Sequence, residues 1–346
     1  MGQLEKGQIR TNEIREIYGL LGDDLSREVY ENRLLYSLTG DMKFVRNVVC
    51  TIPEGKEIYK RLKTGKNIGI FGAGTVGRHL AQIYTDIPFE CFIDNKRAGT
   101  MYEGLPVLSL KEYRARFDDG TIVISTKLYY REIIKQLLDE GIPEENIINI
   151  GMEYEKLNHL QYFDLPQLKE KSVSKETFVD CGSYDGSTAI DFLKWCSSPG
   201  GYIYAWEPDP DNQMKCRMLL DKNQVEYELI PKGLWSGPGE LKLKTAGTSS
   251  MILDDGDIKI EVDSIDRLTN RPVTFIKMDI EGSEYPALLG ARKTIETHKP
   301  KLAVCVYHRP EDMWVLPWLI HEMNPEYKFF LRHYSFADND TVLYAL

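Results

Sequence analysis

The chain has 346 residues, which is enough for two domains of ordinary size with a substantial core. Apolar residues make up 42% and charged residues 28%, as in globular proteins, and the formal net charge is -10. This acidic balance, without a run of five basic residues, argues against a nucleic-acid partner, because contacts to phosphate backbones need a surplus of lysine and arginine.

The N-terminus and the cysteines bear on the cellular location. Residues 1–6 are polar, and Lys6 stands where a myristoylation signal needs serine or threonine. No stretch approaches the ~18 apolar residues of a membrane span. The six cysteines occur singly, without metal-binding spacing, as is usual in a reducing compartment. We therefore predict a cytoplasmic protein and assign no metal ligands. The sequence leaves the oligomeric state open, and also whether a divalent ion at Asp279 or Glu281 is used.

Residues 1–60 are predicted to form a helical segment. Tyr30, Leu34 and Leu38 recur at helical spacing after Ser26, a residue type that caps helix N-termini. We expect this apolar face to pack on the domain that follows.

Residues 61–150 are predicted to form a first, Rossmann-like domain. The apolar run 67–71 leads into the glycine turn 72–77, whose G-x-G-x-x-G spacing lets a helix N-terminus approach a pyrophosphate. Further strands are predicted at 90–94, 121–125 and 147–150. Because helical patterns separate these strands, a small parallel sheet is expected.

Residues 151–175 are predicted to connect the two domains. They are polar and lack clear periodicity. Of the two roles open to Tyr154 and Tyr162, a domain interface is favoured over an acceptor groove.

Residues 176–346 are predicted to form a second α/β domain. A helix is expected at 189–196, and strands are expected at 177–180, 202–207, 227–230, 274–279, 301–307, 328–333 and 341–344. The last two strands form a hairpin. A parallel sheet closed by an antiparallel hairpin is the layout of the class I methyltransferase fold rather than of the dehydrogenases. The predicted fold class is therefore α/β with two Rossmann-like domains.

Polar residues follow the first two strands of this second domain, at the sheet edge where such folds bind ligands. The first strand ends in Asp180 and in a turn that contains Gly182, Asp185 and Gly186. An acidic residue in this turn repels phosphate but suits an amino group. Glu207, after the second strand, can accept both hydroxyls of a ribose, although it could instead cap the helix that follows. These five residues predict a site for S-adenosylmethionine, which has an amino group, a sulfonium and a ribose but no phosphate.

Two further strand ends supply the candidate catalytic groups. Lys277, Asp279 and Glu281 share one side by the period of two, which is costly unless they face a site or one another. His308 follows the next strand and is a candidate to take a proton from a hydroxyl, with His333 as a second candidate. We predict that His308, Asp279 and Glu281 are catalytic, with the two carboxylates orienting the acceptor.

The second domain resembles the FkbM family of S-adenosylmethionine-dependent methyltransferases over about residues 173–346. The segments that carry the resemblance are 179–186, 206–208, 248–251, 276–284, 289–291 and 307–312. The resemblance implies O-methylation of a small-molecule or glycan acceptor, frequently a sugar, and a place in polysaccharide biosynthesis. Asp185 is a departure, since the family often has asparagine there.

Two alternative functions stay open. The first domain resembles small Rossmann-like modules that precede some sugar-modifying enzymes, through 72–77, 92–95 and 104–107. Asp94 has the spacing at which an acid reaches an adenosine ribose, so the first alternative is an NAD-dependent sugar-nucleotide oxidoreductase, although no tyrosine-lysine motif follows. This domain could equally bind a sugar nucleotide, a glycan or nothing. The second alternative is a non-catalytic glycan-binding protein.

Overall fold

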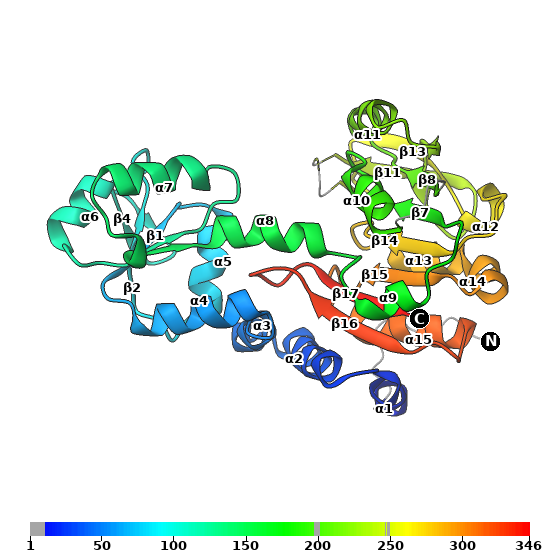
Figure 1. Cartoon of the computed structure of the whole chain (residues 1–346), viewed down its shortest axis with the longest axis horizontal. Coiled ribbons are helices and arrows are strands. Elements are labelled where there is room, and N and C mark those ends of the chain that lie inside the picture. The colour runs from blue at the N-terminus through cyan, green and yellow to red at the C-terminus, as the bar shows by residue number, and fades with distance from the viewer. Residues whose placement is uncertain (1–10, 197–200, 246, 248–249) are drawn as a thin grey trace. The chain divides into compact units, whose positions relative to one another are not determined.

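The computed structural model describes residues 11–196, 201–245, 247 and 250–346 and divides into two compact units (Figure 1). Unit 1 comprises the residues up to Tyr30 together with Tyr162–Arg332 and Asp340–Leu346, and unit 2 comprises Glu31–Gln161 and His333–Asn339. The predicted boundaries at 60, 150 and 175 do not coincide with this division. The region 1–6, analysed for targeting signals, and Thr248 and Ser249 of the family resemblance lie outside the described residues.

Four helices occupy the region predicted to be helical. They are α1 (Thr11–Leu20), α2 (Asp24–Thr39), α3 (Met42–Val49) and α4 (Pro53–Thr64). The predicted cap of α2 was wrong: Asp23 Oδ1 accepts hydrogen bonds from the amide and the hydroxyl of Ser26, at 2.8 and 2.6 Å. An aspartate that engages the first turn in this way starts the helix three residues earlier. Tyr30 is buried as expected, whereas Leu38 is 49% exposed.

Unit 2 is built on a six-stranded sheet of order β3-β4-β2-β1-β5-β6. Its strands are β1 (Ile68–Phe71), β2 (Phe89–Ile93), β3 (Met101–Tyr102), β4 (Leu105–Leu108), β5 (Ile122–Ile124) and β6 (Ile147–Asn149). Neighbouring strands are parallel except β3 and β4. The connections contain α5 (Thr75–Ile83), α6 (Leu110–Arg116), α7 (Tyr130–Asp139) and the short 3-10 helix Glu144–Asn146. The predicted parallel strands are present, while the short strands β3 and β4 were missed.

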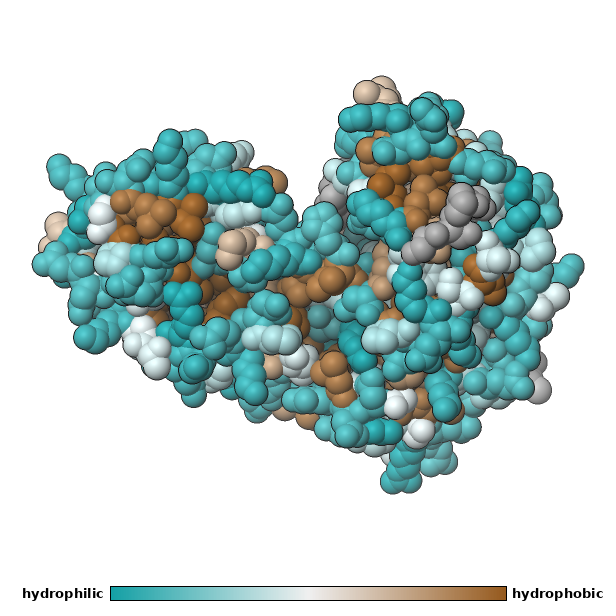
Figure 2. Space-filling model, viewed as in Figure 1, coloured by the Kyte–Doolittle hydropathy of each residue, from teal (hydrophilic) through white to brown (hydrophobic). Residues whose placement is uncertain are grey.

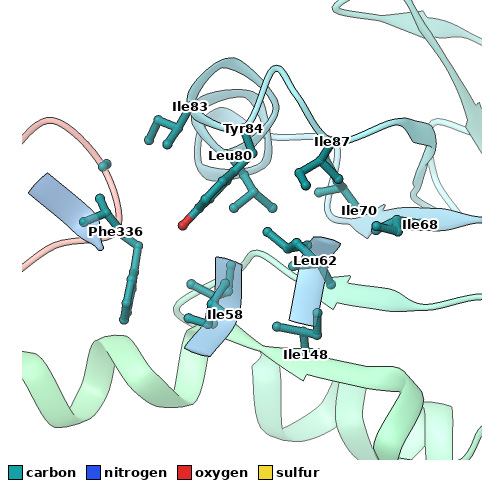
Figure 3. Packing of buried hydrophobic residues seen from close by; sticks show 14 of the residues in the cluster. Ile58, Leu62, Ile68, Ile70, Leu80, Ile83, Tyr84, Ile87, Ile148 and Phe336 are labelled. Carbon is teal, nitrogen blue, oxygen red and sulfur yellow. The ribbon is translucent and has the colours of Figure 1, made fainter. Parts of the chain in front are cut away.

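The main core of unit 2 gathers side chains from α4, α5 and the sheet. Figure 3 shows Ile58 of α4, Leu80 of α5 and Ile70 of β1 directed toward a common centre. Phe336, from the C-terminal segment of this unit, belongs to the same cluster and packs edge-on against Tyr154 with ring centroids 4.9 Å apart. A segment near the end of the chain thus completes this core.

The predicted connection contains two helices, α8 (Ile150–Leu160) and α9 (Pro166–Glu170). Tyr154 and Leu157 are buried, and their spacing of three residues places them on one side of α8. The remaining positions are mostly polar, so the helical period is weak in the sequence. The division between the units falls directly after this helix, at Gln161.

Unit 1 is built on a seven-stranded sheet of order β16-β17-β15-β14-β7-β8-β9. The parallel strands are β7 (Thr177–Cys181), β8 (Tyr202–Trp206), β9 (Tyr227–Ile230), β14 (Phe275–Met278) and β15 (Lys301–Cys305). β17 (Thr341–Ala345) is antiparallel to β15 and lies beside β16 (Phe329–His333), which confirms the predicted class I layout. The strand order reverses between β7 and β14, and ligands bind at such a point.

Besides α1 and α9, unit 1 contains the helices α10 (Ser187–Cys196), α11 (Pro210–Lys222), α12 (Ile265–Leu268), α13 (Glu284–Leu289), α14 (Arg292–His298) and α15 (Asp312–Met323). α10 contacts α11, whereas α13 and α14 contact α15. None of the described helices is long and apolar enough to cross a membrane. Hydrophilic side chains cover most of the face shown in Figure 2.

A second, four-stranded sheet of unit 1 was not predicted. Its order is β10-β13-β11-β12, with β10 (Gly233–Leu234), β11 (Gly239–Lys244), β12 (Met251–Ile252) and β13 (Ile258–Asp263). The buried residues of its core cluster are Leu243, Ile260 and Val262. With so few buried apolar positions, the sheet leaves little hydrophobic signal in the sequence.

Candidate active site

A cavity in unit 1 lies beyond the carboxyl ends of β7, β8 and β14, where the strand order reverses. Four of the residues that line it, Gly182, Glu207, Asp279 and Glu281, were predicted as site residues. The unpredicted four-stranded sheet supplies a wall that includes Leu243. The predicted strand ends therefore meet in one place, and part of the enclosure comes from a sheet that the sequence did not reveal.

Gly182 brings the turn after β7 against the turn after β14. Its φ is 79°, and a Cβ at this position would lie 2.1 Å from the carbonyl oxygen of Asp279. Lys277, which is buried, donates to the carbonyls of Cys181 and Gly182 at 3.1 and 2.8 Å. Its ammonium is 3.2 Å from Asp180 Oδ1. Asp180 is fully buried and does not line the cavity, and its backbone carbonyl accepts the Ser183 hydroxyl of the turn at 2.9 Å.

Asp185 and Gly186 also stay outside the cavity lining. Asp185 Oδ1 accepts the amide N–H of Ser187 at 3.0 Å, in the first turn of α10. Gly186 has a φ of 82° and lies close to Cys216. The structure thus gives these two predicted cofactor-binding residues a role in the turn, and it does not place the Asp185 carboxylate in the cavity.

Glu207 is buried and lines the cavity. Its two carboxylate oxygens accept the amide N–H groups of Tyr184 and Asp209, each at 2.9 Å. Burial raises the pKa of Glu207 to about 7. The capping alternative was wrong, because Asp209 caps α11 by accepting the amide of Asp211 at 2.9 Å. The backbone therefore fixes the orientation of Glu207, and each oxygen keeps a lone pair for a ligand hydroxyl.

Asp279, Glu281 and His308 come together as predicted, but His308 does not line the cavity. His308 Nε2 is 3.4 Å from Asp279 Oδ1 and 3.6 Å from Glu281 Oε2, and its Nδ1 is 2.9 Å from Glu284 Oε1. Burial lowers the pKa of His308, but the carboxylate of Glu284, followed by the other two, outweighs burial and raises it to about 10. The surrounding carboxylates thus favour the protonated imidazole, and the role of His308 as a proton acceptor stays a prediction.

Two further residues lie in this region: Glu284 was not predicted, and Tyr162 had been considered for an acceptor groove, although a domain interface was favoured. Glu284 is 1% exposed and its Oε1 accepts the amide N–H of Ile280 at 2.9 Å. Tyr162 donates its hydroxyl to Asp279 Oδ2 at 2.7 Å. The segment 279–284 was recognised as a motif, and its last acid could have been considered for the site. Nothing in the sequence linked Tyr162 to Asp279.

The second histidine candidate lies elsewhere. His333 belongs to unit 2, where its Nε2 is 3.0 Å from the carbonyl oxygen of Ala337. Burial lowers its pKa to about 3, so it is neutral in the folded protein. His333 is thus part of the hairpin structure.

Unit 2 has a cavity of its own, lined by the glycine turn and Asp94. Gly72 has a φ of 113°, and a Cβ on Gly77 would lie 2.3 Å from the Gly72 carbonyl oxygen. Asp94 Oδ1 accepts the amide N–H groups of Lys96 and Arg97 at 2.9 and 3.2 Å. The carboxylate that was considered for an NAD ribose therefore already stabilises its own turn.

Two family models match the chain. Residues 180–337 match the methyltransferase FkbM domain, and residues 64–148 match a domain described as C2185-like, N-terminal. A comparison with curated proteins gave no match.

The chain is also similar to solved structures. The methyltransferase FkbM from Methylobacillus flagellatus KT is 22% identical with a TM-score of 0.51, and the match covers 85% of this chain and 94% of that one. Fibrillarin from Aeropyrum pernix, crystallised with S-adenosyl-L-methionine, is 12% identical with a TM-score of 0.36, and the match covers 56% and 76% of the two chains.

None of these matches supports the oxidoreductase alternative. The unit 1 sheet has the class I methyltransferase layout, and the family model spans the strands and turns that form the cavity, from Asp180 onward. Residues 180–337 are therefore a methyltransferase domain of the FkbM family, whose methyl donor is S-adenosyl-L-methionine.

Proposed function

We propose that unit 1 methylates a hydroxyl group of a sugar or of another small-molecule or glycan acceptor. The observation that carries this proposal is the meeting of Glu207, Asp279 and Glu281 in one cavity at the reversal of the strand order. Carboxylates accept hydrogen bonds from hydroxyls, so this lining suits both a ribose and a hydroxyl-bearing acceptor. The FkbM resemblance favours a sugar.

The donor is assigned to the part of the cavity formed by Gly182 and Glu207. When bound, S-adenosyl-L-methionine supplies an electrophilic methyl group. Glu207 fits its ribose, because this buried carboxylate is held by two amides and makes no ion pair in the described part of the chain. The close approach of Gly182 to Asp279 sets the shape of the turn beside it.

The acceptor is assigned to Asp279 and Glu281. Methyl transfer depends mainly on holding the acceptor oxygen in line with the methyl group, which is a matter of position and orientation. Asp279 is held from two sides, by Tyr162 at 2.7 Å and by Tyr307, whose hydroxyl donates at 3.3 Å. His308 lies beside the two carboxylates and does not line the cavity. We assign it a positioning role, in which it holds Asp279 and Glu281 in place.

Isothermal titration of the full chain tests the donor site. We expect S-adenosylhomocysteine to bind the wild type, and Glu207→Ala to weaken it by about 10-fold to 100-fold, because a hydrogen bond to a charged group contributes about 1.5–3 kcal/mol. Glu228→Ala, which removes an exposed carboxylate from β9, is the matched control and should leave binding unchanged.

The same titration with NAD separates the alternatives. NAD binding without any binding of S-adenosylhomocysteine would overturn the proposal in favour of a nucleotide site in unit 2. Once donor binding is established, methyl transfer from labelled S-adenosylmethionine to a panel of sugars tests the acceptor class, and transfer to amines but not to hydroxyls would contradict O-methylation.

A further inference from the structure

A possible ligand set for a cation lies at the end of β14 in unit 1. One ring nitrogen of His308 and one carboxylate oxygen each of Asp279 and Glu284 lie within 4.8 Å of one another. Atoms that bind one metal ion at about 2.1 Å are at most about 4.2 Å apart, so shifts of a few tenths of an ångström would close the set. We propose that Asp279, Glu284 and His308 bind one first-row divalent metal ion.

Unmet hydrogen-bonding capacity points to a ligand at this place. Glu284 is 1% exposed, and its Oε2 has no hydrogen-bond partner among the described residues. The His308 side chain is 7% exposed, and neither of its ring nitrogens makes a well-directed hydrogen bond, although Glu284 Oε1 is 2.9 Å from Nδ1. Buried polar atoms are rarely left in this state, because a buried donor or acceptor without a partner destabilises the fold. A metal ion would satisfy Glu284 Oε2 and one ring nitrogen of His308, where it would replace a proton.

The contacts of Glu284 also leave the required atom available. Its Oε1 accepts the amide N–H of Ile280 at 2.9 Å, which fixes the carboxylate at the start of α13. Its Oε2 is therefore held in place, without a hydrogen-bond partner of its own in the part of the chain that the structure describes. A fixed carboxylate loses little conformational freedom when it binds a metal ion.

The charges of the cluster favour a cation. Asp279, Glu281 and Glu284 all face His308, and the carboxylate of Asp312 is buried nearby with Arg309 N–H as its hydrogen-bond donor. The buried Lys277 ammonium, which also interacts with Asp279, is 3.2 Å from Asp180. So many carboxylates in a mostly buried cluster are costly unless positive charge offsets them.

The donor set narrows the choice of ion. Mg²⁺ and Ca²⁺ prefer oxygen ligands alone, whereas two carboxylates and an imidazole suit Mn²⁺, Fe²⁺ or Zn²⁺. Three protein ligands leave further coordination positions for water or a substrate oxygen. Asp279 also lines the cavity, so an acceptor hydroxyl is the natural occupant of such a position. This last step rests on the proposed function, whereas metal binding itself does not.

The test uses the full chain, freed of metal with a chelator and titrated with Mn²⁺. Electron paramagnetic resonance counts the bound ions, and its pulsed form detects nitrogen from a bound imidazole. We expect one ion per chain with a nitrogen coupling, and at least about 10-fold weaker binding in His308→Ala and in Glu284→Gln. His321→Ala is the matched control, because His321 lies 3.2 Å from Glu16 in a histidine-glutamate pair outside the cluster, and its binding should equal that of the wild type.

Absence of Mn²⁺ binding up to about 1 mM would overturn the proposal, and so would binding that lacks the nitrogen coupling or is indifferent to both substitutions. Thermal unfolding without metal checks that the variants fold. If His308→Ala does not fold, the nitrogen coupling of the wild type and the titration of Glu284→Gln still test whether the metal ion binds at this cluster. Binding of S-adenosylhomocysteine is measured on the same samples. A protein that binds S-adenosylhomocysteine but does not bind Mn²⁺ would contradict the metal site and leave the proposed function standing.

Discussion

Glu207 shows, at the scale of single residues, how a fold sets the charge of one carboxyl group. Burial disfavours the ionised form, while the amide N–H groups of Asp209 and Tyr184 favour it. Burial dominates, and the pKa rises to about 7. The group thus changes charge near neutral pH, in the cavity assigned to the methyl donor.

This residue makes donor binding dependent on pH. The ionised carboxylate is the better acceptor for ribose hydroxyls, so we expect the affinity for S-adenosylhomocysteine to rise by up to about 10-fold between pH 6 and pH 8. Titration calorimetry at several pH values measures this slope. In Glu207→Gln the affinity should be lower and nearly flat with pH, and an equally steep slope in that variant would contradict the assignment.

Folding stability should show the opposite trend. The folded-state pKa of Glu207 lies above the ordinary value of 4.5, so the folded protein binds more protons between pH 4.5 and pH 7. The stability gained from the buried neutral acid is therefore complete below pH 4.5 and is lost as the pH rises through 7.

The predicted site residues differ in how well the sequence could place them. Gly182, Glu207, Asp279 and Glu281 line the cavity because they follow strands whose carboxyl ends meet at one sheet edge. Asp185 follows β7, as Gly182 does, yet its carboxylate accepts the amide N–H of Ser187 in the first turn of α10. Alternation along a strand stops where the strand stops, so the direction of a side chain in the turn is not readable from the sequence.

The start of α2 illustrates the element scale. Asp23 accepts two hydrogen bonds from Ser26 and is 2.6 Å from Arg332 on β16 through its other oxygen. Burial raises the pKa of Asp23, but the hydrogen bonds with Arg332 and Ser26 outweigh it and lower the pKa to about 2. One carboxylate therefore starts a helix and ties it to a strand.

Asp23→Ala should lower the free energy of unfolding by about 1–2 kcal/mol, as expected for a lost helix cap and a partly exposed ion pair. Chemical denaturation at pH 7 measures this difference. Because the folded-state pKa lies below 3.8, the contribution is present above pH 3.8 and is lost as the pH falls toward 2, where variant and wild type should converge. Asp24→Ala, at the exposed neighbouring position, is the control, and an equal loss there would contradict the role of Asp23.

The four-stranded sheet of unit 1 marks the limit of prediction for whole elements. In β11 the burial of successive residues does not alternate cleanly, and Leu243 is its one buried position. Period-two patterns identify strands that bury the side chains of one face. This sheet buries few side chains, so its strands show no clear alternation in the sequence. The larger parallel sheets, whose strands are buried apolar runs, were found with few errors of boundary.

At the scale of the whole molecule, the two units draw on separate parts of the chain. The strands β16 and β17 belong to the sheet of unit 1, while His333–Asn339, which begins at the last residue of β16, belongs to unit 2. Phe336 is 3% exposed and lies among the side chains from α4, α5 and α8 in the unit 2 core (Figure 3). Domain boundaries drawn along the sequence could not include this segment, because its partners are about 180 residues or more away in the chain.

Phe336→Ala should destabilise unit 2 by about 3–5 kcal/mol, the usual cost of removing a buried phenylalanine. Amide hydrogen exchange locates the effect, with faster exchange expected in β1 and β5. Phe178→Ala, at a fully buried position of β7, is the counterpart and should act on unit 1 instead. Unchanged exchange in β1 and β5 of Phe336→Ala would show that the hairpin segment contributes little to that core.

The hairpin has a consequence for the order of events during synthesis. The ribosome delivers β1 to β6 long before it delivers Phe336 and Ala337, although both residues are part of the unit 2 core. A nascent chain with a complete first sheet therefore still exposes the apolar surface that these two side chains cover. Unit 2 reaches its final packing only after Phe336 and Ala337 have been made, so the synthesis of this segment, rather than that of its own sheet, completes its folding.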